Sequence, residues 1–221
     1  MNTPQTYVPI AEAAFIGEVT APQMNRLVDE DLVPNSLLVQ ELGARKFARL
    51  SAAFAAFFFA ESELVAGTRR RILQELTARV QQLQSANEVL ALQLMPRNFD
   101  WTVFVSPAVT VDVSSFISAA MGRAKEVDNA DKLIVEDAGI LGGLPCFAET
   151  RVPIENVLAS LDKGAAKERV LRSYPFLTDA HIDAARVYDL VHPRKGRPRS
   201  LSDTNPATLR RVTKVVRAAK A

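Results

Sequence analysis

The sequence predicts a mostly α-helical protein with a small β component, an α+β fold. Apolar residues recur at three- and four-residue steps in several segments, whereas β-branched and aromatic runs are few and short. Hydrophobic residues make up 48% and charged residues 24% of the 221 residues, the balance of an ordinary globular protein. We expect four regions, at residues 1–65, 66–130, 131–192 and 193–221.

The N-terminal region predicts two short helices joined by a tight turn. The first covers Ile10–Ile16, and Gly17 can supply the positive φ that ends it. Thr20 and Gln23 then form the Thr-x-x-Gln pattern of a capping box at the start of the second helix. Two short helices joined by about three residues have helix-turn-helix geometry. An ordinary helical hairpin with the same spacing remains an alternative.

The segment after the second helix predicts a small wing. Two short extended pieces between Leu32 and Leu38 surround a Pro-Asn-Ser turn signal. A helix is then expected from Ala44 to Ala60, with basic residues exposed near its start. These basic residues are Arg45, Lys46 and Arg49.

The middle region predicts a helix, a β-hairpin and a second helix. The first helix is expected from Thr68 to about Ser85, and the hairpin from two β-branched runs at 101–105 and 109–113. Ser114 starts the second helix, which runs to about Val127 and is followed by an acidic linker. A heptad-like series indicates either a dimer contact or a packed bundle face. Its members are Leu73, Leu76, Val80, Leu83 and Leu90.

The region 131–192 predicts a compact helical unit, and the last region is a basic tail. Pro153 suits the first turn of a helix ending near Gly164, and Thr178 caps another helix through Leu190.

Residues 193–221 hold nine Lys or Arg and one acid, whereas the rest of the chain has 18 basic and 24 acidic residues. This split predicts a basic arm for an anionic partner.

Composition and motifs argue against several classes of protein. The only cysteine is Cys146, so one chain cannot form a disulfide or a cysteine metal cluster. The start has no signal-peptide pattern, and the longest apolar run, Ala52–Ala60, is far short of the roughly 20 residues that span a bilayer. His181 and His192 lie in no catalytic motif. We therefore expect a cytoplasmic protein that is not an enzyme, has no cofactor or metal, and does not contact a membrane.

An ordered set of motifs in residues 133–190 resembles a widespread bacterial family of small helical domains. The motifs are Gly142-Gly143-Leu144-Pro145, Thr150-Arg151-Val152-Pro153, Gly164 and Tyr174-Pro175-Phe176-Leu177-Thr178. The family usually has glycine before the Thr-Arg pair, where this sequence has Glu149. Because glycine adopts a positive φ cheaply and glutamate does not, the backbone shape of this loop is in question.

Residues 7–38 resemble the DNA-binding start of the MerR superfamily, in Ala13-Ala14, in Ile16–Thr20 and in Leu27–Pro34. The two resemblances together, with the hairpin region and the basic tail, resemble a noncanonical VapB-type antitoxin that carries a helix-turn-helix. Such proteins repress their own operon and inhibit a PIN or PIN-like ribonuclease toxin, so the resemblance implies both roles. A MerR-like regulator that senses a small molecule, and a scaffold that never touches DNA, remain alternatives.

The candidate site residues follow from these roles. A recognition helix reads base edges with its N-terminal side chains, and basic side chains hold phosphates. The candidate DNA-binding residues are Thr20, Gln23, Asn25, Arg26, Arg45, Lys46 and Arg197, the last in a segment that resembles an AT-hook core or is a plain linker. On DNA we expect a homodimer, and with toxin a heterotetramer or larger assembly.

The tail is the candidate toxin-binding segment. Asn205 and Pro206 suit the start of a helix whose apolar residues recur at three- and four-residue steps. An arginine beside that stripe can pair with the carboxylates of a metal-dependent ribonuclease. The candidates are Leu209, Arg210, Arg211, Val212, Lys214, Val216 and Arg217. The same helix on DNA phosphates remains an alternative.

Overall fold

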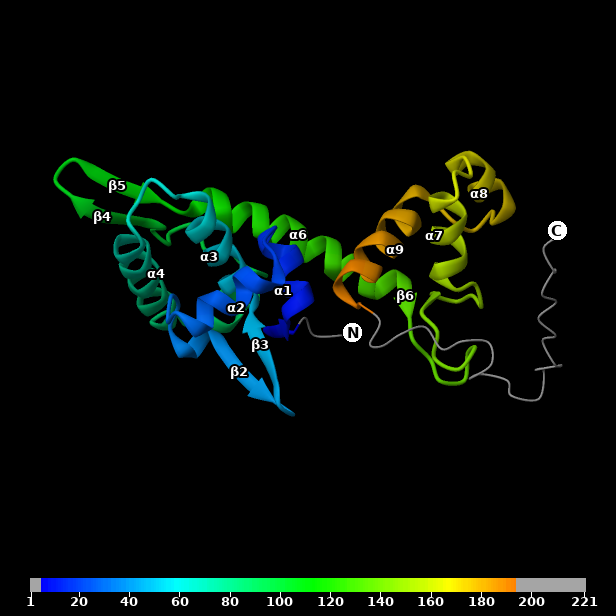
Figure 1. The fold of residues 1–221 in the computed structure, drawn as a ribbon, viewed down its shortest axis with the longest axis horizontal. Helices are drawn as coiled ribbons and strands as arrows, with labels where there is room; N and C mark the ends of the chain where they lie inside the picture. The colour runs from blue at the N-terminus through cyan, green and yellow to red at the C-terminus, as the bar shows by residue number, and fades with distance from the viewer. Residues whose placement is uncertain (1–4, 194–221) are drawn as a thin grey trace, which may run out of the picture.

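Helix α6 (Ser114–Leu133) joins two lobes of an elongated molecule (Figure 1). The computed structural model describes residues 5–193. The fold is mostly helical with three small antiparallel sheets in the described part of the chain, in agreement with the predicted α+β class. Arg197 and the candidate toxin-binding residues lie outside the described residues.

The N-terminal lobe packs helices against a three-stranded sheet of order β1-β3-β2, with the hairpin β4–β5 at its far end (Figure 1). In chain order its elements are β1 (Tyr7–Pro9), α1 (Ile10–Gly17), α2 (Ala21–Asp29), the 3-10 helix η1 (Asn35–Leu37), β2 (Leu38–Glu41), β3 (Ala44–Ala48), α3 (Arg49–Ala60), α4 (Ala66–Gln81), α5 (Ala86–Leu90), β4 (Thr102–Ser106) and β5 (Val109–Asp112).

The C-terminal lobe has its own buried cluster, centred on Phe147, Ile154 and Val157. A two-stranded sheet and three helices surround it, and α9 also packs along α6 (Figure 1). The elements are β6 (Ile134–Val135), β7 (Cys146–Phe147), α7 (Ile154–Asp162), α8 (Lys167–Ser173) and α9 (Asp179–Val191). The helices at Pro153 and Thr178 form as predicted, whereas α8, with Val170 as its single buried residue, was not predicted.

One hydrophobic cluster contains buried residues of α1, α3, α4 and α6 between Val8 and Val127, together with Val191 of α9. The predicted boundary after residue 65 falls inside this cluster. Leu73, Leu76 and Val80 are fully buried in it, as a packed bundle face requires, so these three side chains are not exposed for a dimer seam.

The predicted capping box is present at the start of α2. The backbone N–H of Thr20 donates to Gln23 Oε1 at 2.8 Å, and the Gln23 N–H donates to Thr20 Oγ1 at 3.3 Å. These two bonds satisfy backbone donors that the first turn of a helix cannot pair. The sequence pattern therefore located the start of α2 correctly.

The expected role of Gly17 was wrong. The left-handed residue that ends α1 is Glu18, with φ of 51°. Gly17 is needed for a different reason, because a Cβ atom there would lie 2.6 Å from the carbonyl oxygen of Ala52 on α3. Because α1 approaches α3 this closely, any side chain at this position would force the two helices apart.

The wing and the helix after it were also misplaced. The hairpin consists of β2 and β3, and Leu42 and Gly43 turn between them with φ of 49° and 79°. Two positive φ values are typical of a type I′ turn, but Leu-Gly lacks the Asn-Gly signal that would reveal it. Arg45 and Lys46 therefore lie on a strand, and α3 begins only at Arg49, which is buried.

Two further boundaries were wrong. Helix α4 starts at Ala66 and ends at Gln81, before the predicted end at Ser85. Helix α6 continues to Leu133, so the supposed acidic linker after Val127 is helical. Within this continuation, Asp128 Oδ1 lies 2.8 Å from Nη1 of the buried Arg49, a contact that no local sequence pattern indicates.

We expect Gly17→Ala to lower the free energy of unfolding by about 1–3 kcal/mol, because the new methyl group forces α1 away from α3. Urea denaturation followed by circular dichroism measures the change. The matched control is Gly122→Ala in α6, whose Cβ would meet no atom within 4 Å. This control should gain up to about 1 kcal/mol from helix propensity. Equal effects of the two substitutions would contradict the close-approach argument.

Candidate nucleic-acid interface

The candidate surface consists of α2 and the hairpin β2–β3, which lie side by side (Figure 1). Met24 and Leu27 are fully buried and anchor α2 on the core. On the hairpin, Arg45 Nη1 lies 2.8 Å from Asp29 Oδ1 at the end of α2. This ion pair links the strand to the helix.

Acidic neighbours occupy most of the cationic groups on this surface. Arg26 Nε lies 2.8 Å from Glu30 Oε1, and Lys46 Nζ lies 2.5 Å from Glu41 Oε2. The hydrogen bond from Arg26 is the main reason that the pKa of Glu30 lies below its ordinary value. Phosphates would have to compete with these carboxylates.

Gln23 and Asn25, the two polar candidates on α2, are not equally free to contact a base. The side chain of Gln23 is committed to the cap of its own helix, where Thr20 also donates to it. Asn25 is half-buried and lines the same cleft as Arg45 and Lys46. The structure thus brings Asn25 and the two hairpin cations together.

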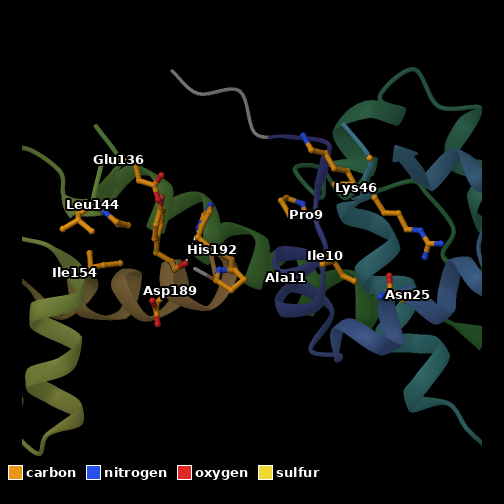
Figure 2. A pocket seen from close by; sticks show the side chains of 17 residues that line it. Pro9, Ile10, Ala11, Asn25, Lys46, Glu136, Leu144, Ile154, Asp189 and His192 are labelled. Carbon is orange, nitrogen blue, oxygen red and sulfur yellow. Dashed lines mark hydrogen bonds between the residues drawn. The ribbon is translucent and has the colours of Figure 1, made fainter. Parts of the chain in front are cut away.

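That cleft lies between the two lobes and has a volume of about 1020 Å³. Figure 2 shows Pro9, Ile10, Asn25 and Lys46 on the wall formed by the N-terminal lobe, and Glu136, Leu144, Ile154 and Asp189 on the opposite wall. A groove beside the candidate nucleic-acid surface was not expected from the sequence, because its two walls are about 100 residues apart in the chain.

On the C-terminal wall, Tyr188 contacts both Glu136 and His192. Its hydroxyl donates to Glu136 Oε1 at 3.1 Å, and its ring stacks on His192 with the centroids 4.1 Å apart. Burial, followed by the nearby Glu136 carboxylate, raises the pKa of Tyr188 well above its ordinary value. Tyr188 is therefore a neutral hydrogen-bond donor at physiological pH.

A buried ionic cluster lies where α1, α3 and α6 meet. Arg49 is 2% exposed and places Nη2 at 2.8 Å from Glu12 Oε1 and Nη1 at 2.8 Å from Asp128 Oδ1. Burial raises the pKa of Glu12 despite the attraction of Arg49, and the nearby Asp131 adds to this effect. One guanidinium thus pairs with two carboxylates, and a third acidic group, Asp131, lies near them. No pattern in the sequence indicates this cluster, because its members are far apart in the chain.

No group of three or more His, Cys, Asp or Glu residues between positions 5 and 193 is arranged to hold a metal ion. Cys146 is buried on β7. In the same part of the chain, no helix combines the length and the apolar character needed to cross a membrane.

Comparison with known proteins adds a family and a relative. Residues 134–188 match the family described as "Protein of unknown function (DUF433)". The chain is also 28% identical over 193 residues to the "Uncharacterized protein y4eO" of Sinorhizobium fredii (strain NBRC 101917 / NGR234). This similarity covers 87% of the present chain and 85% of that protein. No solved structure matches.

The loop at Glu149 lies inside the matched segment and keeps a glycine-like backbone. Glu149 has φ of 61°, in a turn closed by the Thr150 hydroxyl, which donates to the Phe147 carbonyl at 2.8 Å. The side chain of Glu149 is exposed. The loop therefore has the shape that a glycine would favour, in spite of the substitution.

We expect Glu149→Gly to raise the free energy of unfolding by about 0.5–1 kcal/mol. Glycine relieves the strain of the left-handed backbone, and the greater chain entropy of glycine in the unfolded state offsets part of this gain. Thermal and urea denaturation both measure this. Glu149→Ala is the control, because it removes the same side chain and keeps the strain. Equal stabilities of the two variants would show that the backbone at this position is relaxed.

We expect Arg49→Leu to lower the free energy of unfolding by about 3–5 kcal/mol, because it leaves two carboxylates uncompensated beside the core. Adding Glu12→Gln should recover part of that loss. Arg151→Leu, at an exposed arginine, is the control in the same urea titration. A loss no larger than that of the control would contradict the role of the cluster.

The raised pKa of Glu12 also predicts a pH dependence. The folded protein holds the Glu12 proton more tightly than the unfolded chain, so stability falls as pH rises from the ordinary carboxyl pKa to the raised one. Above that window the cost is constant. Glu12→Gln should remove this component, which is measured as the difference between the two proteins in urea denaturation at several pH values. Parallel pH profiles would show that Glu12 does not titrate in this range.

Proposed function

We propose that this protein is a DNA-binding antitoxin that represses its own operon through α2 and the hairpin β2–β3 and inhibits a PIN-like ribonuclease toxin. The observation that carries the DNA-binding role is the pairing of a capped, exposed helix with a basic hairpin, linked by the Arg45–Asp29 ion pair. A helix for the major groove beside a wing for the phosphate backbone is the arrangement that such regulators use.

In this proposal α2 enters the major groove and Asn25 reads an adenine through its amide. Arg26 is exposed and can turn from Glu30 to a guanine, since an exposed ion pair of this kind contributes only about 0–1 kcal/mol. Arg45 and Lys46 hold phosphates. Gln23 supports the helix start instead of a base, because its side chain is used in the cap.

The charge of this surface makes a second source of phosphate affinity necessary. Asp29, Glu30 and Glu41 offset the three cations, so the lobe alone would bind DNA weakly. The basic residues 193–221, with a net charge of +8 from nine basic residues and one acid, can supply it. Arg197, at the AT-hook-like segment, is our candidate for minor-groove insertion.

The ribonuclease-inhibiting role is supported by the sequence resemblance to VapB-type antitoxins. Residues 134–188, which match DUF433, contain all the motifs of the C-terminal domain on which that resemblance depends. The proposed inhibitory helix begins after Asn205, with Leu209 as its apolar anchor and Arg210 or Arg211 reaching the carboxylates of the toxin.

For DNA binding we expect Asn25→Ala to weaken binding to the protein's own promoter by about 5–150-fold and to relax specificity at one base position. The control is Asn129→Ala, at an asparagine on α6 that lies outside the proposed interface. Fluorescence anisotropy at several salt concentrations, with footprinting, gives both readouts, and the footprint should be a near-palindrome. Unchanged affinity and footprint for Asn25→Ala would remove α2 from the interface.

For toxin inhibition, the informative variant is truncation after Asn205. We expect inhibition of the proposed ribonuclease partner to fall while promoter binding largely survives. Loss of promoter binding with intact inhibition would assign this segment to DNA. A neighbouring gene without PIN-like carboxylates would contradict the antitoxin role itself.

The cleft between the lobes favours a second candidate function, a regulator that senses a small molecule. Its volume of about 1020 Å³ is that of a large ligand site, and Asn25 and Lys46 line it. A ligand there would change promoter binding directly. A metabolic enzyme gene beside this one, together with a ligand retained on purification, would favour the sensor over the antitoxin.

A further inference from the structure

The cleft between the lobes has two walls of different character. The N-terminal wall is formed by Pro9, Ile10 and Asn25 with residues 43–46 of the hairpin (Figure 2). The C-terminal wall is mainly apolar and carries two carboxylates. It is lined by Glu136, Leu144, Pro145, Ile154, Tyr188, Asp189, Val191, His192 and Pro193.

The cationic side chains of the N-terminal wall have ion-pair partners, whereas the carboxylates of the C-terminal wall have none among the described residues. On the N-terminal wall, Arg45 and Lys46 already pair with acids of their own lobe. On the C-terminal wall, Glu136 accepts only the Tyr188 hydroxyl, and neither Glu136 nor Asp189 forms an ion pair with any residue between 5 and 193. The uncompensated charge of the cleft is therefore negative, so the cleft favours a cationic occupant.

The C-terminal wall also has apolar surface for the occupant. Leu144 is 41% exposed, and the stacked rings of Tyr188 and His192 also line the cleft. An occupant that carries cationic groups on an apolar stem would satisfy both the carboxylates and this surface. Lysine and arginine side chains in a segment with regularly spaced aliphatic residues have this chemistry.

The chain itself supplies such a segment at the edge of the cleft. Pro193, the last described residue, lines the cleft. The 28 residues that follow it contain nine Lys or Arg and one acid, with Leu209, Val212 and Val216 at three- and four-residue steps. A tethered segment of this length has an effective concentration in the millimolar range, so weak contacts suffice to hold it.

We propose that residues 194–221 bind in the cleft of their own chain, with basic side chains on Glu136 and Asp189 and aliphatic side chains against Leu144. The cleft is then an intramolecular docking site for the tail. If the proposed function also holds, a docked tail covers Asn25 and Lys46, so the tail has to leave the cleft before these two side chains can contact DNA.

Trypsin sensitivity of the full-length protein tests this. The double variant Glu136→Gln/Asp189→Asn should lose tail segments about fivefold faster or more than the unaltered protein, since two charge pairs are removed. The amide introduced at position 136 keeps an acceptor for the Tyr188 hydroxyl, so the fold should be preserved, which circular dichroism checks. The matched control is Glu168→Gln/Asp183→Asn, which removes the same charges from sites outside the cleft. Equal cleavage rates in all three proteins would overturn the proposal.

Zero-length carbodiimide cross-linking of the unaltered protein gives a readout that needs no variant. We expect cross-links from Lys195, Lys214 or Lys220 to Glu136 or Asp189, mapped by mass spectrometry. An equal mixture of isotopically light and heavy protein shows whether they form within one chain. Links only between chains, or links only to acids outside the cleft, would overturn the proposal, and a small molecule retained in the cleft would replace the tail as its occupant. Neither measurement uses DNA or toxin, so each can fail independently of the proposed function.

Discussion

Arg49 lies at the point where the three helices that define this molecule meet. It is the first residue of α3, directly after the strand that carries Arg45 and Lys46, and it pairs with Glu12 of α1 and Asp128 of α6. Arg123 adds a second link, because its Nε donates to the Ile16 carbonyl at the end of α1 at 2.6 Å. These contacts join α1 and the start of α3 to α6, in addition to the apolar packing of the same helices.

The second lobe is held in place by the packing of α9. Helix α9 packs along α6 and also against α1, and Val191 at its end joins the cluster of the N-terminal lobe. The lobes are therefore joined by packing as well as by a continuous helix (Figure 1). This arrangement forms the cleft and places the C-terminal wall opposite Asn25 and the hairpin.

Local patterns in the sequence predicted the parts of the fold that depend on neighbouring residues. Thr20 with Gln23, Pro153 and Thr178 each located a helix start, and the β-branched runs located the hairpin β4–β5. The sequence could not place the hairpin β2–β3, because Leu42 gives no turn signal. It also could not find the ionic cluster or the cleft, which join residues more than 30 positions apart.

In the proposed function, α2 and the hairpin β2–β3 together form the DNA-contacting surface. Hydrogen–deuterium exchange of the full-length protein, with and without a duplex of its own promoter, tests it most directly. We expect slower exchange at the start of α2 and in residues 43–46 on adding DNA, with little change in α7 and α8. Unchanged exchange in α2 and the hairpin, with protection confined to the C-terminal lobe, would contradict it.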